Sequence, residues 1–202
     1  MASASEADGS TPYAVVEADA LYFRPPTLED LPSIHALESA GYPPDEAAPE
    51  ASLRMRIEEC GQLFLCAVSG GGGGVDEIVG YVCATCTAAP KLTHESMSTH
   101  DPDGTLLCIH SVCVAEGQRC KGIATRTLGA YLNFVCATSP QLTQIRLLSK
   151  ENMLKLYTGV GFTLLGPSDV VHGAETWYEL SYDLAEEDGA VQEEGGAPEE
   201  GA

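Results

Sequence analysis

The chain has 202 residues, a length typical of one domain with flanking segments and too short for two large domains. Hydrophobic residues make up 44% of it, enough for a core. No apolar run approaches the roughly 20 residues of a membrane span, which excludes an integral membrane protein. Lys and Arg number 10 against 30 Asp and Glu, and the net charge of −20 disfavours binding to the phosphate backbone of nucleic acids. We therefore expect no nucleic-acid partner and no membrane partner.

Both ends of the chain are acidic. Residues 1–20 contain four acids and no base, and residues 185–202 contain seven acids and no base. This composition is typical of disorder, so we expect two disordered flanks around one domain over residues 21–184. The first residues lack the basic and long apolar stretches of a signal peptide, which indicates a cytoplasmic protein.

Strand-like and helix-like segments alternate along the domain. Strands are predicted over residues 21–24, 62–68, 78–87, 105–114, 144–148, 162–165 and 176–184. Helices are predicted over 27–40, 51–60, 122–137 and 151–157, and the loop 88–104 holds a candidate short helix at 94–100. The first helix opens on Thr27-Leu-Glu-Asp30, a capping box with Asp in place of Glu. The order is β-α-α-β-β-β-α-β-α-β-β, and the fold class is α/β (α+β).

A run of glycines, residues 70–74, separates the strands predicted over 62–68 and 78–87. Glycine loses more conformational freedom on ordering than any other residue, so this run predicts a flexible hairpin tip. It is not a phosphate-binding loop, because no Lys-Ser or Lys-Thr follows and no helix begins there.

Most of the eight cysteines lie in apolar runs of a chain with no signal peptide, so we expect buried free thiols rather than disulfides. The single C-x-x-C, Cys83 to Cys86, lies in a predicted strand, where residues three apart face opposite sides of the sheet. No second cysteine pair completes four ligands, so no metal is expected.

The segment 105–130 carries the clearest chemical signal. A strand runs into Arg119-Cys120-Lys121-Gly122-Ile123-Ala124, and a helix begins at once. The first amides of a helix lack internal partners, and the helix dipole adds partial positive charge, so such a turn binds anions. Arg119, Lys121 and Arg126 are three of only ten basic residues in the chain. The pattern predicts a phosphate-binding turn.

This strand, R-x-x-G-x-A turn and helix resemble the acetyl-CoA motif of the GCN5-related N-acetyltransferase (GNAT) superfamily, and the element order is similar to that fold across residues 21–184. Within the superfamily, three segments resemble the arylalkylamine (serotonin) N-acetyltransferases. They are Glu95-Ser96-Met97-Ser98-Thr99-His100, Ile109-His110-Ser111-Val112-Cys113-Val114 and Leu156-Tyr157. The resemblance implies a mixed, mostly antiparallel sheet flanked by helices. It also implies acetyl-CoA as co-substrate.

The resemblance also assigns roles. The backbone of Val112, Cys113 and Val114 would bind the pantetheine arm as an added strand does. Arg119, Cys120, Lys121, Gly122, Ile123, Ala124 and Thr125 would hold the pyrophosphate. The acceptor amine arrives as an ammonium ion and needs a base, a role that suits His110. Tyr157 would return a proton to the leaving thiolate.

Cys108 stands where the resembled family has the first of two histidines. A paired-histidine relay is therefore not expected, and His110 acts alone or through a water chain. Cys108 allows a second mechanism, transfer through an acyl-cysteine. The apolar surroundings raise the pKa of a thiol, so we favour direct attack of the amine on acetyl-CoA.

We expect the acceptor to be a small arylalkylamine such as serotonin, tryptamine, tyramine or phenylethylamine. Leu92 and Met97 are expected to bind the substrate, because the loop 91–104 can lay their apolar side chains over an aromatic ring. Leu148, in the strand predicted over 144–148, is a further expected substrate-binding residue. Two alternatives stay open. One is an acetyltransferase for protein N-termini, lysines or polyamines, and the other is a non-catalytic CoA-binding or adaptor protein. The sequence yields no prediction for a protein partner or an oligomeric state.

Overall fold

The protein is described by a computed structural model over residues 20–70, 76–93, 95–170 and 175–184, without the side chains of Ala20 and Met97. The predicted disordered flanks and residues 71–75 of the glycine hairpin lie outside the described residues. Within the described part of the chain, no helix is long and apolar enough to cross a membrane.

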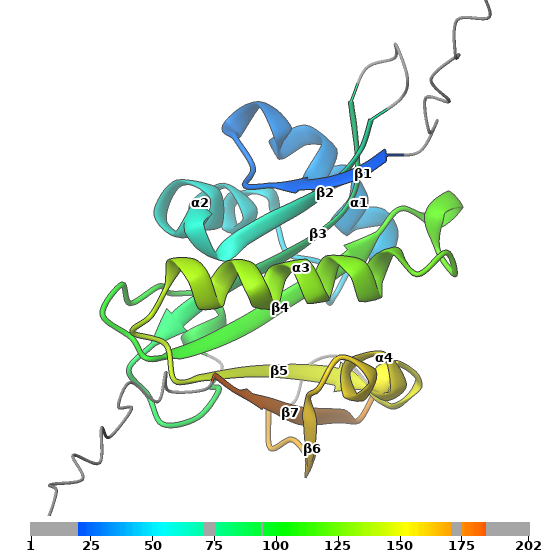
Figure 1. Cartoon of the computed structure of the whole chain (residues 1–202). Helices are drawn as coiled ribbons and strands as arrows, with labels where there is room; N and C mark the ends of the chain where they lie inside the picture. The colour runs from blue at the N-terminus through cyan, green and yellow to red at the C-terminus, as the bar shows by residue number, and fades with distance from the viewer. Residues whose placement is uncertain (1–19, 71–75, 94, 171–174, 185–202) are drawn as a thin grey trace, which may run out of the picture.

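One seven-stranded sheet organises the domain, with its strands in the order β1-β2-β3-β4-β5-β7-β6 (Figure 1). All neighbouring strands pair antiparallel except β4 and β5, which pair parallel. The predicted mixed, mostly antiparallel sheet is therefore confirmed. The strands are β1 (Ala20–Arg24), β2 (Phe64–Gly70), β3 (Glu77–Thr87), β4 (Leu106–Val114), β5 (Gln144–Lys150), β6 (Thr163–Pro167) and β7 (Trp177–Asp183).

The predicted element order is confirmed, with ends that differ by a few residues. The strand predicted from residue 62 begins at Phe64, because a 3-10 turn, η2 (Gly61–Leu63), closes the preceding helix. The candidate helix at 94–100 is only a 3-10 turn, η3 (Glu95–Met97). The helices are α1 (Leu31–Gly41), α2 (Glu50–Cys60), α3 (Ile123–Thr138) and α4 (Leu154–Gly159), with 3-10 turns η1 (Leu28–Asp30), η4 (Glu116–Gln118) and η5 (Glu151–Met153).

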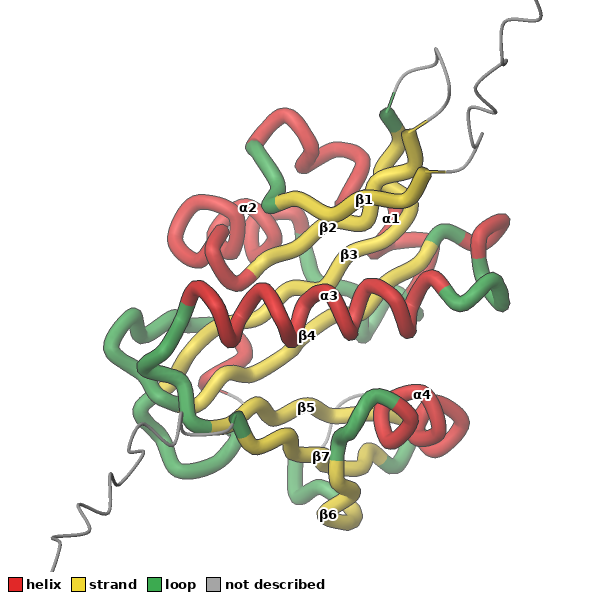
Figure 2. Tube along the Cα trace, viewed as in Figure 1, coloured by secondary structure: helices red, strands yellow, loops and turns green. Residues whose placement is uncertain are grey.

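Helices cover both faces of the sheet. Leu128, Tyr131 and Val135 of α3 pack with Leu107 and Ile109 of β4 in the largest apolar cluster, which Tyr157 of α4 joins. On the opposite face, residues of α1 and α2 pack against β2 and β3 in a second cluster. The chain therefore forms three layers, with α3 running along one face of the sheet (Figures 1 and 2).

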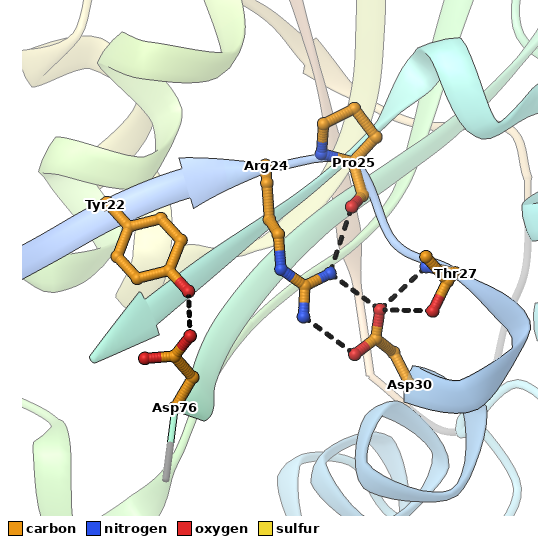
Figure 3. A network of polar contacts seen from close by, with 6 residues as sticks. All are labelled: Tyr22, Arg24, Pro25, Thr27, Asp30 and Asp76. Atoms are coloured by element: carbon orange, nitrogen blue, oxygen red, sulfur yellow. Dashed lines mark hydrogen bonds and ion pairs between the residues drawn. The ribbon is translucent and has the colours of Figure 1, made fainter. Parts of the chain in front are cut away.

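Hydrogen bonds join the first strand to the turn that precedes the first helix, and they include the capping box predicted at Thr27 and Asp30 (Figure 3). Asp30 accepts a hydrogen bond from the backbone N–H of Thr27 at 2.7 Å, the half of a capping box in which the third residue bonds back to the cap. The same carboxylate receives two bonds from the Arg24 guanidinium, at 2.7 and 2.9 Å. These contacts, with Arg24 the largest cause, lower the pKa of Asp30.

All eight cysteines are free, and all but Cys120 and Cys136 are buried. Cys83 belongs to the cluster beneath α1 and α2, whereas Cys86 belongs to the cluster beneath α3. The two side chains thus face opposite sides of the sheet, as their strand spacing predicts. Within the described residues, no group of three or more His, Cys, Asp or Glu side chains could hold a metal ion.

Candidate functional site

β4 and β5 pair over only part of their length. Their parallel register joins four residue pairs, from Leu106–Gln144 to Ile109–Leu147, and then stops. The remainder of β4, residues 110–114, and of β5, residues 148–150, diverge toward the end of the sheet where α3 begins and α4 lies (Figures 1 and 2). Since β5 departs, the edge of β4 that faces it is left without a strand partner.

A β-bulge coincides with the start of this divergence. In the register of β3 with β4, Cys83 pairs with Ser111 and Ala84 pairs with Ile109, so His110 is the extra residue on β4. A bulge bends its strand and increases the local twist, which suits the departure of β4 from β5. The bulge also changes which face of the sheet the following side chains of β4 point to. Ile109 packs under α3, whereas Ser111 bonds to Glu38 of α1 on the other face.

A cavity of about 640 Å³ lies between the diverging strands. Its walls come from β4, β5, the end of α1, the turn before α3 and the start of α4. The residues that line it and were expected to hold a ligand are Leu92, His110, Val112, Cys113, Val114, Arg119, Cys120, Gly122, Ile123, Ala124, Thr125, Leu148 and Tyr157. Lys121 does not line it, and its ammonium donates to Gln118 Oε1 at 2.9 Å. The side chain of Met97 lies outside the described residues.

The start of α3 forms one end of the cavity. The backbone N–H of Arg126 donates the first hydrogen bond of the helix, to the Gly122 carbonyl at 3.0 Å. The backbone N–H groups of residues 123–125 therefore have no partner within the helix. Gly122 caps the helix at φ 75° and Cys120 lies at φ 60°, both left-handed. A side chain on Gly122 would meet nothing within 4 Å, so glycine is required there by the backbone angle and leaves open space beside the amides.

Tyr42, which follows α1, occupies the free edge of β4. Its hydroxyl accepts a hydrogen bond from the Val112 N–H and donates one to the Val112 carbonyl, both at 3.1 Å. A single phenol therefore satisfies both backbone groups that a neighbouring strand would otherwise engage.

His110 is held in one tautomer. Its Nε2 lies 2.7 Å from Thr85 Oγ1, and the same hydroxyl lies 2.7 Å from the Ser96 carbonyl oxygen. The hydroxyl has one proton, and the carbonyl only accepts, so Thr85 donates to Ser96 and accepts from Nε2–H. The proton therefore sits on Nε2, and Nδ1 carries the lone pair. No described group bonds to that buried Nδ1.

The surroundings of His110 keep the imidazole neutral. Burial, and then the positive charge of Arg56, lower its pKa well below 6.5. An imidazole that stays neutral and keeps a free lone pair is equipped to accept a proton.

Tyr157 reaches the cavity from α4. Its ring makes an edge contact with Phe162, with centroids 6.0 Å apart, and burial raises the pKa of the phenol. No described side chain or backbone group forms a hydrogen bond with the hydroxyl. The phenol is therefore a protonated donor across the pH range near neutrality.

Cys108 is fully buried and does not line the cavity. It packs with Leu92 and Leu106, and Leu148 packs against this cluster. Burial raises the pKa of its thiol to about 11. The sulfur is thus an apolar part of the wall behind Leu92 and Leu148.

Known proteins resemble this chain in part of its sequence and in its fold. No family model matches the chain. It is 26% identical over 107 residues to a serotonin N-acetyltransferase from Mesocricetus auratus, a match that covers 53% of this chain and about half, 51%, of that relative. Two solved structures align over nearly their whole length. The GphF GNAT-like decarboxylase in complex with isobutyryl-CoA has a TM-score of 0.69 at 18% identity and covers 81% of this chain and 100% of its own. Arabidopsis thaliana NAA60 in complex with acetyl-CoA has a TM-score of 0.63 at 19% identity, covering 81% and 99%.

The chain has the GNAT fold. The expected resemblance in fold is confirmed, and the diverging strands are the feature of this domain that opens its cavity. The decarboxylase among the matching structures illustrates that one fold supports several reactions, so the activity must be argued from the site.

Several residues that line the cavity, or that bond to the residues lining it, were not predicted from the sequence. Tyr42 and Glu46 lie in the segment between α1 and α2, which the sequence marks only as a proline-rich loop. Thr85 gives no signal on its own, because its contact with His110 joins residues 25 positions apart. The buried Glu38 accepts bonds from Ser111 Oγ at 3.0 Å and the Ala48 N–H at 2.8 Å, and is also bonded by Tyr81. An acid predicted on an amphipathic helix is more often exposed.

The tautomer of His110 is directly measurable. In nitrogen-15 spectra at neutral pH, we expect Nε2 protonated and Nδ1 bare, and we expect the imidazole to stay neutral as the pH falls through 6.5, because its pKa is lowered. The unfolded chain takes up this proton first, so stability should decrease with falling pH in that window. Thr85→Val removes the acceptor for Nε2–H and should mix the tautomers, whereas Thr85→Ser keeps the hydroxyl and the pattern. A wild-type His110 with its proton on Nδ1, or titrating near 6.5, contradicts this geometry.

Proposed function

We propose that this protein is an acetyl-CoA-dependent N-acetyltransferase that transfers acetyl directly to the primary amine of a small arylalkylamine. One observation carries the proposal. The unpartnered Nδ1 of His110 and the unpaired amides at the start of α3 belong to residues that line the same cavity. A base and an anion-binding turn in one cavity suit a reaction between an amine and a phosphate-bearing acyl donor.

The residues around the cavity fit acetyl-CoA. The amides of Ile123, Ala124 and Thr125, with the left-handed Gly122, would bind the pyrophosphate. Arg119 lines the cavity beside them, and its Nε donates to the Val114 carbonyl at 3.1 Å. The edge of β4 offers the backbone of residues 112–114 to the pantetheine arm, which would compete with Tyr42 for Val112. The likeness to NAA60 in complex with acetyl-CoA supports this donor, and the partial likeness to a serotonin N-acetyltransferase supports transfer of an acetyl group.

The side chains of the cavity divide the proton transfers between them. Bound acetyl-CoA supplies an activated acetyl thioester. The acceptor first loses one proton to solvent and reaches His110 as the neutral amine, because an imidazole with a lowered pKa is too weak a base to deprotonate an ammonium ion. His110 then accepts, at Nδ1, the second proton, which the nitrogen loses as its bond to the carbonyl carbon forms. A base with a lowered pKa is adequate, because the nitrogen becomes strongly acidic as that bond develops. Tyr157 holds a proton on its hydroxyl and donates it to the sulfur that departs when the carbon–sulfur bond breaks. The amine proton thus ends on His110 and the phenol proton on the thiol.

An arylalkylamine acceptor is supported by the apolar wall near His110. Leu92 and Leu148 line the cavity and pack with Cys108 and Leu106. Trp177 and Met153 line the same cavity from other elements. These surfaces suit an aromatic ring attached to the amine by a short arm. The partial match to a serotonin N-acetyltransferase points to the same class of acceptor.

The phosphate-binding turn is tested by Gly122→Val. Valine is strained at a positive φ, and its branched side chain would project into the space beside the amides. The affinity for acetyl-CoA, measured by calorimetry on the full chain, should decrease at least about tenfold while the circular dichroism spectrum is retained. Gly129→Ala in the middle of α3, where a side chain also meets nothing within 4 Å, is the matched control and should bind normally. Unchanged affinity in Gly122→Val would remove the turn from the proposal.

The reaction and its base are tested with a panel of acceptors. Purified protein and acetyl-CoA are incubated with serotonin, tyramine, phenylethylamine, spermidine and a peptide with a free N-terminus, and N-acetylated products are identified by mass spectrometry. We expect turnover of the arylalkylamines, reduced about 100-fold or more in His110→Ala. Tyr157→Phe should reduce turnover with little change in acetyl-CoA affinity. Acetylation of only spermidine or the peptide would reject the arylalkylamine class, and wild-type rates in both variants would reject the two roles.

Direct transfer is tested at Cys108. Since this thiol is buried, has a raised pKa and does not line the cavity, protein incubated with acetyl-CoA and no amine should carry no acetyl group on it. Cys108→Ala should retain most of the activity and lose about 1 kcal/mol of stability from the small cavity it leaves. An acetyl adduct on Cys108 that passes to added amine would show transfer through the cysteine instead.

A further inference from the structure

The free edge of β4 is closed by side chains of the protein itself. Val112 directs its N–H and its carbonyl to the Tyr42 hydroxyl, and both hydrogen bonds are 3.1 Å long. Farther along β4, the Val114 carbonyl accepts a hydrogen bond from Arg119 Nε, also at 3.1 Å. All four residues line the cavity. The backbone groups of Val112 and the Val114 carbonyl, which an added strand would engage, are therefore already bonded.

The ladder between β3 and β4 shows why these two valines share the edge. In an antiparallel pair, residues that bond to the partner strand alternate with residues that do not. Ala115 belongs to the first kind, because its N–H donates to the Val79 carbonyl of β3 at 2.8 Å. Val112 and Val114 are then of the second kind, and their backbone groups point away from β3, toward the edge that β5 leaves open.

The segment that carries Tyr42 is anchored independently of this contact. The Tyr42 N–H donates to the Glu38 carbonyl at 3.1 Å, and the Ala48 N–H donates to the Glu38 carboxylate at 2.8 Å. Glu46, between them, lies 2.8 Å from the Lys150 ammonium. The backbone of the segment is thus held at several points, so freeing the edge of β4 requires rotation of the Tyr42 side chain and not movement of the segment.

We propose that Tyr42 is an internal competitor of the acyl donor, whose hydroxyl closes the edge of β4 and must leave Val112 before the pantetheine arm can bind there. This inference rests on the proposed function, which supplies acetyl-CoA as the donor. Only protein in which the hydroxyl has left Val112 is competent to bind the arm, so the contact lowers the apparent affinity for the donor. The nucleotide part of the donor, at the start of α3, needs no such change.

Tyr42→Phe tests the competition, because it keeps the ring and removes only the hydroxyl. Each lost hydrogen bond made a modest net contribution to the closed edge, so acetyl-CoA should bind roughly tenfold more tightly to the variant. Calorimetry on the full chain measures this affinity. The affinity for 3′-phospho-ADP, which has the nucleotide of CoA but no pantetheine arm, should stay unchanged. Thermal unfolding verifies that the variant is folded.

Tyr131→Phe is the matched control. The Tyr131 hydroxyl also donates to a backbone carbonyl, that of Leu63 at 2.9 Å, but Tyr131 does not line the cavity. Acetyl-CoA and 3′-phospho-ADP should both bind to this variant as they bind to the wild-type protein. Equal tightening of acetyl-CoA binding in the two Phe variants would overturn the proposal, because a general loosening of the fold would then explain it.

The contact can also be followed in the wild-type protein. Without added ligand, we expect a nuclear Overhauser contact between the Tyr42 ring and the Val112 N–H, which the hydroxyl bridges. Saturating acetyl-CoA should abolish this contact, because the arm takes the place of the hydroxyl. Saturating 3′-phospho-ADP should leave it intact.

The outcomes separate this inference from the proposed function. Acetyl-CoA that binds Tyr42→Phe no more tightly than the wild type, or a Tyr42–Val112 contact that persists in the acetyl-CoA complex, would overturn the competition and leave donor binding in place. Equal tightening of 3′-phospho-ADP in Tyr42→Phe would also overturn it, since that ligand has no arm. If the wild-type protein binds neither ligand, the proposed function fails and the inference fails with it.

Discussion

The early divergence of β4 from β5 is the constraint on which the rest of this site depends. Four residue pairs hold the two parallel strands together, and at His110 the bulge turns β4 away. The divergence leaves one edge of β4 without a strand partner and opens the cavity between the strands. It also brings the start of α3, which follows β4, and α4, which follows β5, to the two sides of the same opening (Figure 1).

The segment between α1 and α2 spans that opening. Tyr42 bonds to the backbone of Val112 on β4, while Glu46 pairs with Lys150 on β5. Between these contacts, the Ala48 amide donates to the buried carboxylate of Glu38 at 2.8 Å. The loop is therefore attached to both diverging strands and to α1 beneath them. Tyr42 and Glu46 both line the cavity, so a ligand bound there would meet this loop.

Local patterns predicted what local interactions determine. The order of strands and helices followed from periodicity, the Thr27–Asp30 cap from its spacing, and the turn before α3 from Gly122 and its basic neighbours. Contacts between segments that are distant in the sequence could not be predicted. The bulge at His110 and the contact of His110 with Thr85 cannot be predicted from the sequence of β3 or of β4 alone, because both depend on the register between the two strands. The same holds for Glu46, whose ion pair with Lys150 joins residues 104 positions apart.

The proposed function requires that the opening between β4 and β5 binds an acyl-CoA along the edge of β4 and at the start of α3. Backbone amide spectra of the isotope-labelled full chain, recorded during titration with acetyl-CoA, test it most directly. We expect saturable shifts concentrated at residues 112–114 and 122–125, with the edge strand β1 unaffected. Saturable shifts that avoid both segments, or no saturable shifts at all, would contradict it.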